Sequence, residues 1–298
     1  MADLLTGLDG TTPLDLETLT RAAAAGLAGE PNIPAVTGVA IVDGTENRFP
    51  TSHSALLSLS SDGGSEPHLV FLKKVTAAAM AHKPWPDRRR TLAYIRTELR
   101  VYEEFGATLL ERGVPLPKPR LLISQLDALG GTEVASPPGD EPSEEALREC
   151  GALLFLEPVG AGYEQGSPLA PERAAVALAA VANLHAASWE DRELLGRAAD
   201  RLQRHGGAYN LSIRNPAELT KIRANWESFV ATFTAHDPEL FSQPGMLTLG
   251  ERLERWAPWV AAQLDAEPTD AHATLVHGDF KAMNQGGFIQ HSIHTSAD

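Results

Sequence analysis

Short apolar runs separated by turn residues fill the first part of the chain. The run around Val36–Val42 ends at Asp43-Gly44, and two more apolar runs flank an Asp-Gly-Gly turn at Asp62–Gly64. Runs of this length, bounded by Asp and Gly, are typical of strands joined by hairpins. The pattern therefore predicts an antiparallel sheet with a hairpin at Asp62–Gly64, whose second strand is Leu69–Val75.

Helical periodicity appears on either side of these strands. Residues 14–29 are rich in alanine and end in glycine, and apolar residues recur every three or four positions in Arg88–Arg112 until Gly113. This period gives a helix one apolar face, and glycine commonly follows the last helical residue. A further strand is expected at Arg120–Gln125, and a surface loop follows it over 130–145. Another short strand is expected within Leu147–Val159.

Beyond Glu157 the pattern becomes helical. Pro171 suits the first turn of a helix that runs to about Ser188, and nearly every position in this helix is apolar or small, so we expect it to be buried. Two more helices are expected over Pro216–Phe233 and Gly250–Leu264.

These elements together predict an α+β fold with two lobes. Residues 1–156 form a β-rich lobe with one main helix, and residues 157–298 form a helical lobe. A ligand-binding cleft is expected where two such lobes meet. The length of 298 residues agrees with two modest units.

Composition and charge narrow the partners and the location. Lys and Arg number 25 against 39 Asp and Glu, and a net charge of −14 argues against a protein that binds nucleic acid phosphates non-specifically. The single cysteine, Cys150, cannot form an internal disulfide, which favours a reducing compartment. No signal peptide and no membrane span is recognised, so we expect a soluble, cytoplasmic monomer.

The segment TLVHGDFKAMN, residues 274–284, carries the most informative pattern. Lys281 and Asn284 follow His277-Gly278-Asp279 directly after an apolar stretch. An aspartate can orient a hydroxyl and accept its proton, an asparagine can offer its carbonyl oxygen to Mg²⁺, and a lysine can neutralise phosphate charge. The combination predicts a phosphoryl-transfer loop, whereas each residue alone would indicate only a polar surface loop.

A phosphate clamp is the partner that this loop requires. Side chains alternate along the strand VFLKKV, so Lys73 and Lys74 point to opposite faces. Glu98 lies along the apolar stripe of the following helix, where an unpaired carboxylate would be costly. Lys73–Glu98 is the predicted pair. The alternative is an exposed glutamate and an unrelated lysine on an edge strand.

The motif HGDFKAMN resembles the catalytic motif of the aminoglycoside phosphotransferase and choline kinase superfamily, most closely its ecdysteroid-kinase-like branch. These are small-molecule kinases with a protein-kinase-like fold. The resemblance extends from Val36 to Asn284. The other segments that carry it are VFLKKV, TELRVYEEF, PLPKPRLLIS, LLFLEPV and LAAVANLHAASWE.

The resemblance implies a role for each matched residue. Asp279 would be the catalytic base, with Lys281 beside it in the catalytic loop and Asn284 as a Mg²⁺ ligand. Lys73 would contact the phosphates of ATP, and Glu98 would hold Lys73. The neighbours of the adenine would be Leu156, Glu157 and Val159.

Five other features have weaker patterns. His277 would brace the catalytic loop, and His185 is interpreted as structural. The phosphate-covering region, Asp43–Ser54, lacks a run of glycines, so its contacts stay unassigned. Two sets of residues could be interpreted as binding sites: a metal patch at His291, His294 and Asp298, and a phosphate site on the basic residues Arg88–Arg90, Arg96 and Arg100. For both sets the preferred interpretation is ordinary solvated surface.

The sequence departs from the kinase pattern after Asn284. Kinases of this fold carry a second metal-binding aspartate on a strand downstream, whereas this chain reads QGGFIQHSIHTSAD, as if truncated. Two functions therefore stay open. One is an ATP-dependent kinase that transfers the γ-phosphoryl group to a hydroxyl of an organic acceptor, sterol-like or another small alcohol. The other is an inactive kinase-like remnant or binding module.

Overall fold

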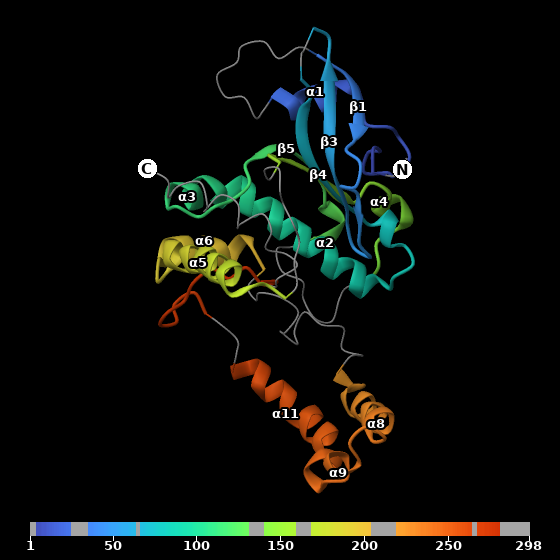
Figure 1. Cartoon of the computed structure of the whole chain (residues 1–298), viewed down its shortest axis with the longest axis vertical. Helices are drawn as coiled ribbons and strands as arrows, with labels where there is room; N and C mark the ends of the chain where they lie inside the picture. Colours follow the sequence, from blue (N-terminus) through green and yellow to red (C-terminus); the bar gives the residue numbers. More distant parts are fainter. Residues whose placement is uncertain are drawn as a thin grey trace.

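A single antiparallel sheet is the centre of the first half of the protein. The computed structural model describes residues 4–24, 35–63, 66–130, 140–158, 168–203, 219–263 and 267–280. Within them the sheet has the order β1-β3-β4-β6-β5, with β2 paired to β3 (Figure 1). The strands are β1 (Val36–Ile41), β2 (Asn47–Arg48), β3 (His53–Ser61), β4 (His68–Thr76), β5 (Pro119–Gln125) and β6 (Gly151–Leu156). The predicted hairpin and its second strand are confirmed, because β3 and β4 pair in antiparallel register.

Each face of the sheet is covered by a different helix. α1 (Leu16–Ala24) packs its Leu19 and Ala23 on the face that carries Leu57, Leu72 and Phe155. α2 (Trp85–Arg100) packs its Leu92, Ile95 and Leu99 on the opposite face, against Val75 and Leu154. The alternation of side chains along each strand thus divides the apolar residues between two cores.

The predicted helix over Arg88–Arg112 is a longer, continuous helical segment. α2 passes through a π-helical turn (Val101–Phe105) into α3 (Gly106–Glu111). Gly113 then has a φ of 83°, a conformation that glycine adopts without the cost that a Cβ would add. The added residues, Trp85–Asp87, lie at its start, and its far end comes at Glu111, one residue before the predicted one.

The far end of this helical segment packs on two helices of the second half, α5 (Pro171–Ser188) and α6 (Arg192–Arg201). Phe105, Leu109, Leu194 and Ala198 lie in one apolar cluster, which Leu184 and Leu275 also join. At its border, Arg201 Nη2 lies 2.6 Å from Glu104 Oε1. The two predicted lobes are therefore in direct contact through the helix that carries Glu98.

The expectation that α5 is buried is wrong. Among its described residues only Ala177, Ala180 and Ser188 are buried, and Leu178 is 60% exposed. Alanine has little apolar area, so leaving alanines exposed costs little free energy. An alanine-rich helix can therefore be covered on one side only. Composition alone overestimated how deeply this helix would be enclosed.

The helices between 219 and 263 form a group of their own, which Figure 1 shows at the opposite end from the sheet. This group consists of α8 (Ile222–Phe233), α9 (Pro238–Phe241), α10 (Pro244–Leu247) and α11 (Leu249–Gln263). Trp226 joins α8 to α10 by donating its indole N–H to the carbonyl of Met246 at 2.7 Å, and its ring lies against Gly250. No helix in the described part of the chain combines the length and apolar content needed to cross a bilayer.

Two local expectations need correction. The segment predicted as loop over 130–145 leads into a short helix, α4 (Glu144–Arg148), capped by Ser143, while residues 131–139 lie outside the described part. The basic face of α2 is only partly solvated, since Arg88 is 5% and Arg96 7% exposed. Arg96 donates to the carbonyl of Gly130 at 2.8 Å. A residue predicted to lie on the solvated surface therefore connects α2 to the segment that follows β5.

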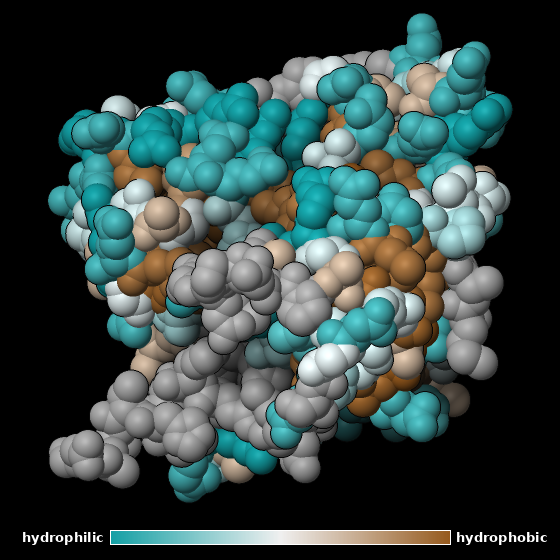
Figure 2. All heavy atoms as spheres, turned by 90° about the horizontal axis from the view of Figure 1, so that it is seen from above, coloured by the Kyte–Doolittle hydropathy of each residue, from teal (hydrophilic) through white to brown (hydrophobic). Residues whose placement is uncertain are grey.

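The surface at the sheet end is largely hydrophilic. Figure 2, which looks down on this end, shows mostly polar residues with hydrophobic ones visible between them. This agrees with the division of apolar side chains into internal cores on the two faces of the sheet.

Candidate functional site

Lys73 and Glu98 form the ion pair that the sequence predicts. Lys73 lies in β4 opposite Leu154 of β6, on the face of the sheet that α2 covers. Its Nζ donates to Glu98 Oε2 at 2.6 Å. The two side chains are 29% and 32% exposed, so the pair is held by the protein and still accessible from solvent. This accessibility is what a group that contacts a phosphate requires.

The position of Glu98 follows from the period of α2. Ile95 and Leu99 on the same side of the helix are buried against the sheet, and Glu98 lies at the edge of that apolar stripe. Tyr102, in the π-helical turn, lies next along this stripe. Burial raises the pKa of Tyr102 well above its usual value, and the negative charge of Glu98 raises it further. The Glu98 carboxylate thus lies among partly buried groups, with Lys73 as its cation.

The HGD segment forms a tight turn. Gly278 has a φ of 80°, which permits the turn that places Asp279 next to the ring of His277. The amide of Asp279 donates to Nδ1 of His277 at 3.3 Å. An Nδ1 that accepts a hydrogen bond leaves the proton of the neutral imidazole on Nε2. The His277 ring also meets Phe280 edge-on, at 5.9 Å between ring centroids.

The ion pair and the HGD turn lie close enough to interact electrostatically. Burial lowers the pKa of His277, and the ammonium of Lys73 lowers it too, while the carboxylates of Asp279 and Glu98 oppose this shift. Burial and the hydrogen bond that Nδ1 accepts from the Asp279 amide thus both favour the neutral form of His277. A strand lysine and an aspartate far along the chain thus act on one histidine.

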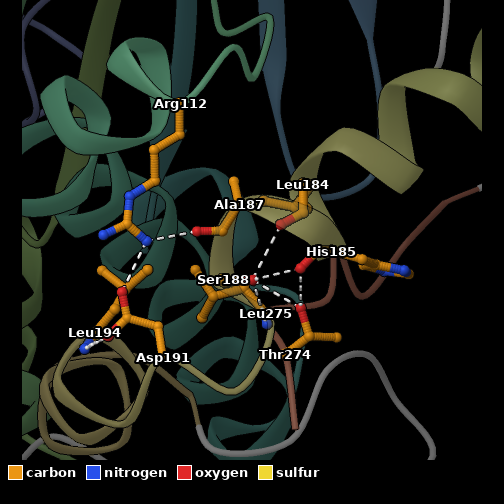
Figure 3. Close-up of polar contacts among 9 residues, drawn as sticks. All are labelled: Arg112, Leu184, His185, Ala187, Ser188, Asp191, Leu194, Thr274 and Leu275. Carbon is orange, nitrogen blue, oxygen red and sulfur yellow. Dashed lines mark hydrogen bonds and ion pairs between the residues drawn. The ribbon is translucent and has the colours of Figure 1, made fainter. Parts of the chain in front are cut away.

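The stretch before this turn is attached to the end of α5 (Figure 3). The hydroxyl of Ser188 contacts that of Thr274 at 2.7 Å and accepts the amide of Leu275 at 3.0 Å. The hydroxyl of Thr274 donates to the carbonyl of His185 at 2.8 Å. The His185 ring itself points away from these hydroxyls in Figure 3, which agrees with the structural interpretation of this residue.

A second set of bonds joins the end of the long helix to the same corner. Arg112 Nη1 donates to the carbonyl of Ala187 at 2.6 Å and to Asp191 Oδ2 at 2.8 Å (Figure 3). Asp191 also caps α6 by accepting the amide of Leu194. An open hollow of about 440 Å³ lies beside these bonds, lined by Arg112, Asn183, Ala186 and Ala187. The corner that anchors the HGD segment is thus tied to both predicted lobes.

The end of β6 is the predicted adenine-binding segment. Leu156 is buried in the core beneath α2, and the amide of Glu157 donates to the carbonyl of Lys118 at 2.8 Å. That bond connects the end of β6 to the segment before β5 and uses the Glu157 amide within the protein. Val159 lies outside the described residues.

The segment over Asp43–Ser54 makes a compact turn whose own groups are bonded to one another. His53 Nε2 lies 2.7 Å from Glu46 Oε1, and the hydroxyl of Thr45 donates to the carbonyl of Val42 and accepts the amide of Leu56. Gly44 has a φ of 76°. These bonds give the turn a defined shape, although they assign no phosphate contact.

Several predicted residues lie outside the described part of the chain. Lys281 and Asn284 are among them, as are His291, His294 and Asp298, so their predicted roles stay predictions. Over the described residues there is no group of three or more His, Cys, Asp and Glu side chains that could hold a metal ion. The candidate site residues within the described part of the chain are therefore Lys73, Glu98, Leu156, Glu157, His277 and Asp279.

Sequence reasoning missed the anchoring residues. Ser188 and Thr274 are ordinary hydroxyl residues in the sequence, and only their position at a helix end and before the HGD motif could have drawn attention to them.

Comparisons of the chain with protein-family models, with curated proteins and with solved structures give no match.

Proposed function

We propose that the protein is an ATP-dependent kinase that transfers the γ-phosphoryl group to a hydroxyl of a small organic acceptor. The observation that carries this proposal is the Lys73–Glu98 ion pair between a strand and the following helix, and the charges of Lys73, Glu98 and Asp279 all act on His277 of the HGD turn. A lysine on a strand, a glutamate on the next helix and an aspartate on a later loop are the parts that kinases use.

The strand arrangement also supports a protein-kinase-like fold. The lysine strand β4 lies in the sheet between β3 and β6, and β6 ends at the segment that would adjoin the adenine. The same lysine faces the helix that follows its strand. In protein kinases the phosphate-binding lysine occupies such a strand and pairs with the glutamate of such a helix.

Each described residue has a chemical task in this mechanism. The ammonium of Lys73, held by Glu98, binds phosphate oxygens of ATP and offsets their charge. Asp279 orients the acceptor hydroxyl and accepts its proton as the oxygen forms a bond to the γ-phosphorus and the bond to the β-phosphate oxygen breaks, which releases ADP. Mg²⁺, for which Asn284 is the proposed ligand, would neutralise charge on the phosphates when bound.

ATP turnover by the purified chain tests the role of Asp279. Turnover is measured with water alone and with a panel of alcohols, sterols among them. Asp279→Ala should reduce turnover by about 10²- to 10⁴-fold, the usual contribution of a general base. Asp200→Ala, at an exposed acidic position in α6, is the matched control and should retain the wild-type rate. Equal rates for wild type and Asp279→Ala would remove Asp279 from the mechanism.

Thermal unfolding with ATP and Mg²⁺ separates the kinase from the inactive remnant. A nucleotide at about 100 times its dissociation constant stabilises the folded protein by about 2.7 kcal/mol. We expect a clear rise in Tm at millimolar ATP. A rise without turnover would indicate a nucleotide-binding module, and no rise would indicate a remnant that does not bind ATP.

A further inference from the structure

The last residue of α5, Ser188, lies at the centre of a chain of hydrogen bonds. Its side chain is fully buried, at 0% exposed. Its hydroxyl lies 3.0 Å from the carbonyl oxygen of Leu184 and 2.7 Å from the hydroxyl of Thr274, which in turn lies 2.8 Å from the carbonyl oxygen of His185. The oxygen of Ser188 in turn accepts the amide of Leu275 at 3.0 Å. The two hydroxyls thus connect the Leu275 amide to carbonyls in the last turn of α5, and linked hydrogen bonds strengthen one another.

Backbone strain marks the same junction. Glu190 and His272 have φ values of 53° and 65°, and they are the only described non-glycine residues with positive φ. They are bonded to each other's segments: the amide of His272 donates to Glu190 Oε1 at 3.0 Å, and the amide of Glu190 donates to the carbonyl of Ala273 at 2.9 Å. Such conformations cost free energy and persist where surrounding bonds enforce them, which is frequent near functional sites.

These contacts fix the register of residues 272–275 against the end of α5. The carbonyl of Ala273 and the amide of Leu275, on either side of Thr274, are both bonded, and Leu275 packs in the apolar cluster with Phe105. A slip by one residue would move the chain about 3.3 Å, which exceeds the tolerance of a hydrogen bond between a base and a hydroxyl. Asp279 lies a single turn beyond this attachment.

We propose that Ser188 and Thr274 are positioning residues for Asp279, and that their paired hydroxyls hold the catalytic turn in register. The catalytic part of this proposal rests on the kinase function proposed above. Neither side chain needs to touch the substrate, because each acts through the backbone of the segment that leads to Asp279.

The test compares Thr274→Val, which keeps the shape and removes the hydroxyl, with Thr274→Ser, which keeps the hydroxyl. In the valine variant we expect the amides of Leu275 and Asp279 to exchange hydrogen at least about 10-fold faster. We also expect kcat to fall by about 100-fold, the effect of a misplacement of about 1 Å, while the KM for ATP stays within about 2-fold because Lys73 and Glu98 are untouched. Serine should restore both exchange and kcat.

Matched controls separate positioning from a general loss of structure. Thr232→Val removes a similar hydroxyl, which donates to the carbonyl of Ser228 in α8, and should change neither readout. Should the valine variant fail to fold, Thr274→Ala removes the same hydroxyl and serves in its place.

Each outcome decides one of the two proposals. Unchanged exchange at Asp279 in Thr274→Val overturns the positioning role, as does an unchanged kcat in an active wild type. If the wild type turns over no ATP while exchange at Asp279 rises in the valine variant and is restored by serine, the positioning role of Ser188 and Thr274 stands and the kinase function falls.

Discussion

Lys73 and Lys74 are neighbours in the sequence with opposite environments in the fold. Lys73 faces α2 and pairs with Glu98 at 2.6 Å, with 29% of its side chain exposed. Lys74 is 4% exposed on the other face, where its ammonium donates to the carbonyl and hydroxyl oxygens of Thr6, at 3.0 and 2.7 Å. One lysine is available to a ligand, and the other attaches the N-terminal segment to the sheet.

Replacing each lysine by methionine should therefore have different effects. Lys73→Met should weaken nucleotide binding by about 10- to 100-fold, the value of one charge-assisted interaction, with little change in stability because partly exposed ion pairs contribute about 0–1 kcal/mol. Lys74→Met should lower the free energy of unfolding by about 1–3 kcal/mol, because buried oxygens of Thr6 lose a donor. Nucleotide titration and urea unfolding of both variants check this. A loss of binding in Lys74→Met alone would contradict the assignment.

Two glycine-to-alanine substitutions should change stability in opposite directions. At Gly151, the first residue of β6, a Cβ would collide with the carbonyl of Val75 and lie 2.8 Å from the Cα of Thr76, so we expect a loss of about 1–3 kcal/mol. At Gly196 in α6 a Cβ would meet nothing within 4 Å, and the substitution should gain about 0.4–1 kcal/mol by reducing the freedom of the unfolded chain. Urea unfolding measures both, and equal effects would contradict the close pairing of β6 with β4 at this point.

Stability should depend on pH through Asp191. The hydrogen bond from the amide of Leu194 lowers the pKa of Asp191 most in the folded protein, and the hydrogen bond from the guanidinium of Arg112 has the next largest effect. A carboxyl group with a lowered folded pKa contributes stability that is fully present above its unfolded pKa of about 3.9 and is lost as the pH falls through the folded pKa.

Asp191→Asn isolates this effect, because asparagine still caps a helix but carries no charge. The variant should be less stable than wild type at pH 7, and the difference should shrink as the pH falls below about 4. Urea unfolding at several pH values between 7 and 3 measures it. A difference that stays constant with pH would show that the charge of Asp191 does not contribute.

Cys150 should react only when the protein opens. The thiol is 1% exposed, and burial raises the pKa of Cys150 to about 11. The thiolate fraction at pH 8 is then on the order of one in a thousand, and the thiolate is the reactive form. We expect slow modification by a thiol reagent in buffer and full modification in denaturant. Rapid labelling of the folded protein would contradict the burial of this residue in the core beneath α2.

Local patterns in the sequence were sufficient to predict the individual elements. The alternation along β4 separated Lys73 from Lys74, and the period of α2 placed Glu98 on the side of the sheet, so their ion pair could be predicted before the fold was known. The Asp-Gly turn located the hairpin between β3 and β4. These predictions succeeded because strand and helix periods fix the direction of a side chain within a few residues.

The surroundings of each face of a helix or strand depend on segments far away in the sequence. Only the tertiary structure decided these surroundings. Composition predicted a buried α5 and a solvated Arg96, yet α5 is largely exposed and Arg96 is bonded to Gly130. In the same way, the sequence by itself identified the HGD motif but not the hydroxyls of Ser188 and Thr274 that hold it. Periodicity determines which way a side chain points, whereas packing between elements far apart in the chain determines what it meets.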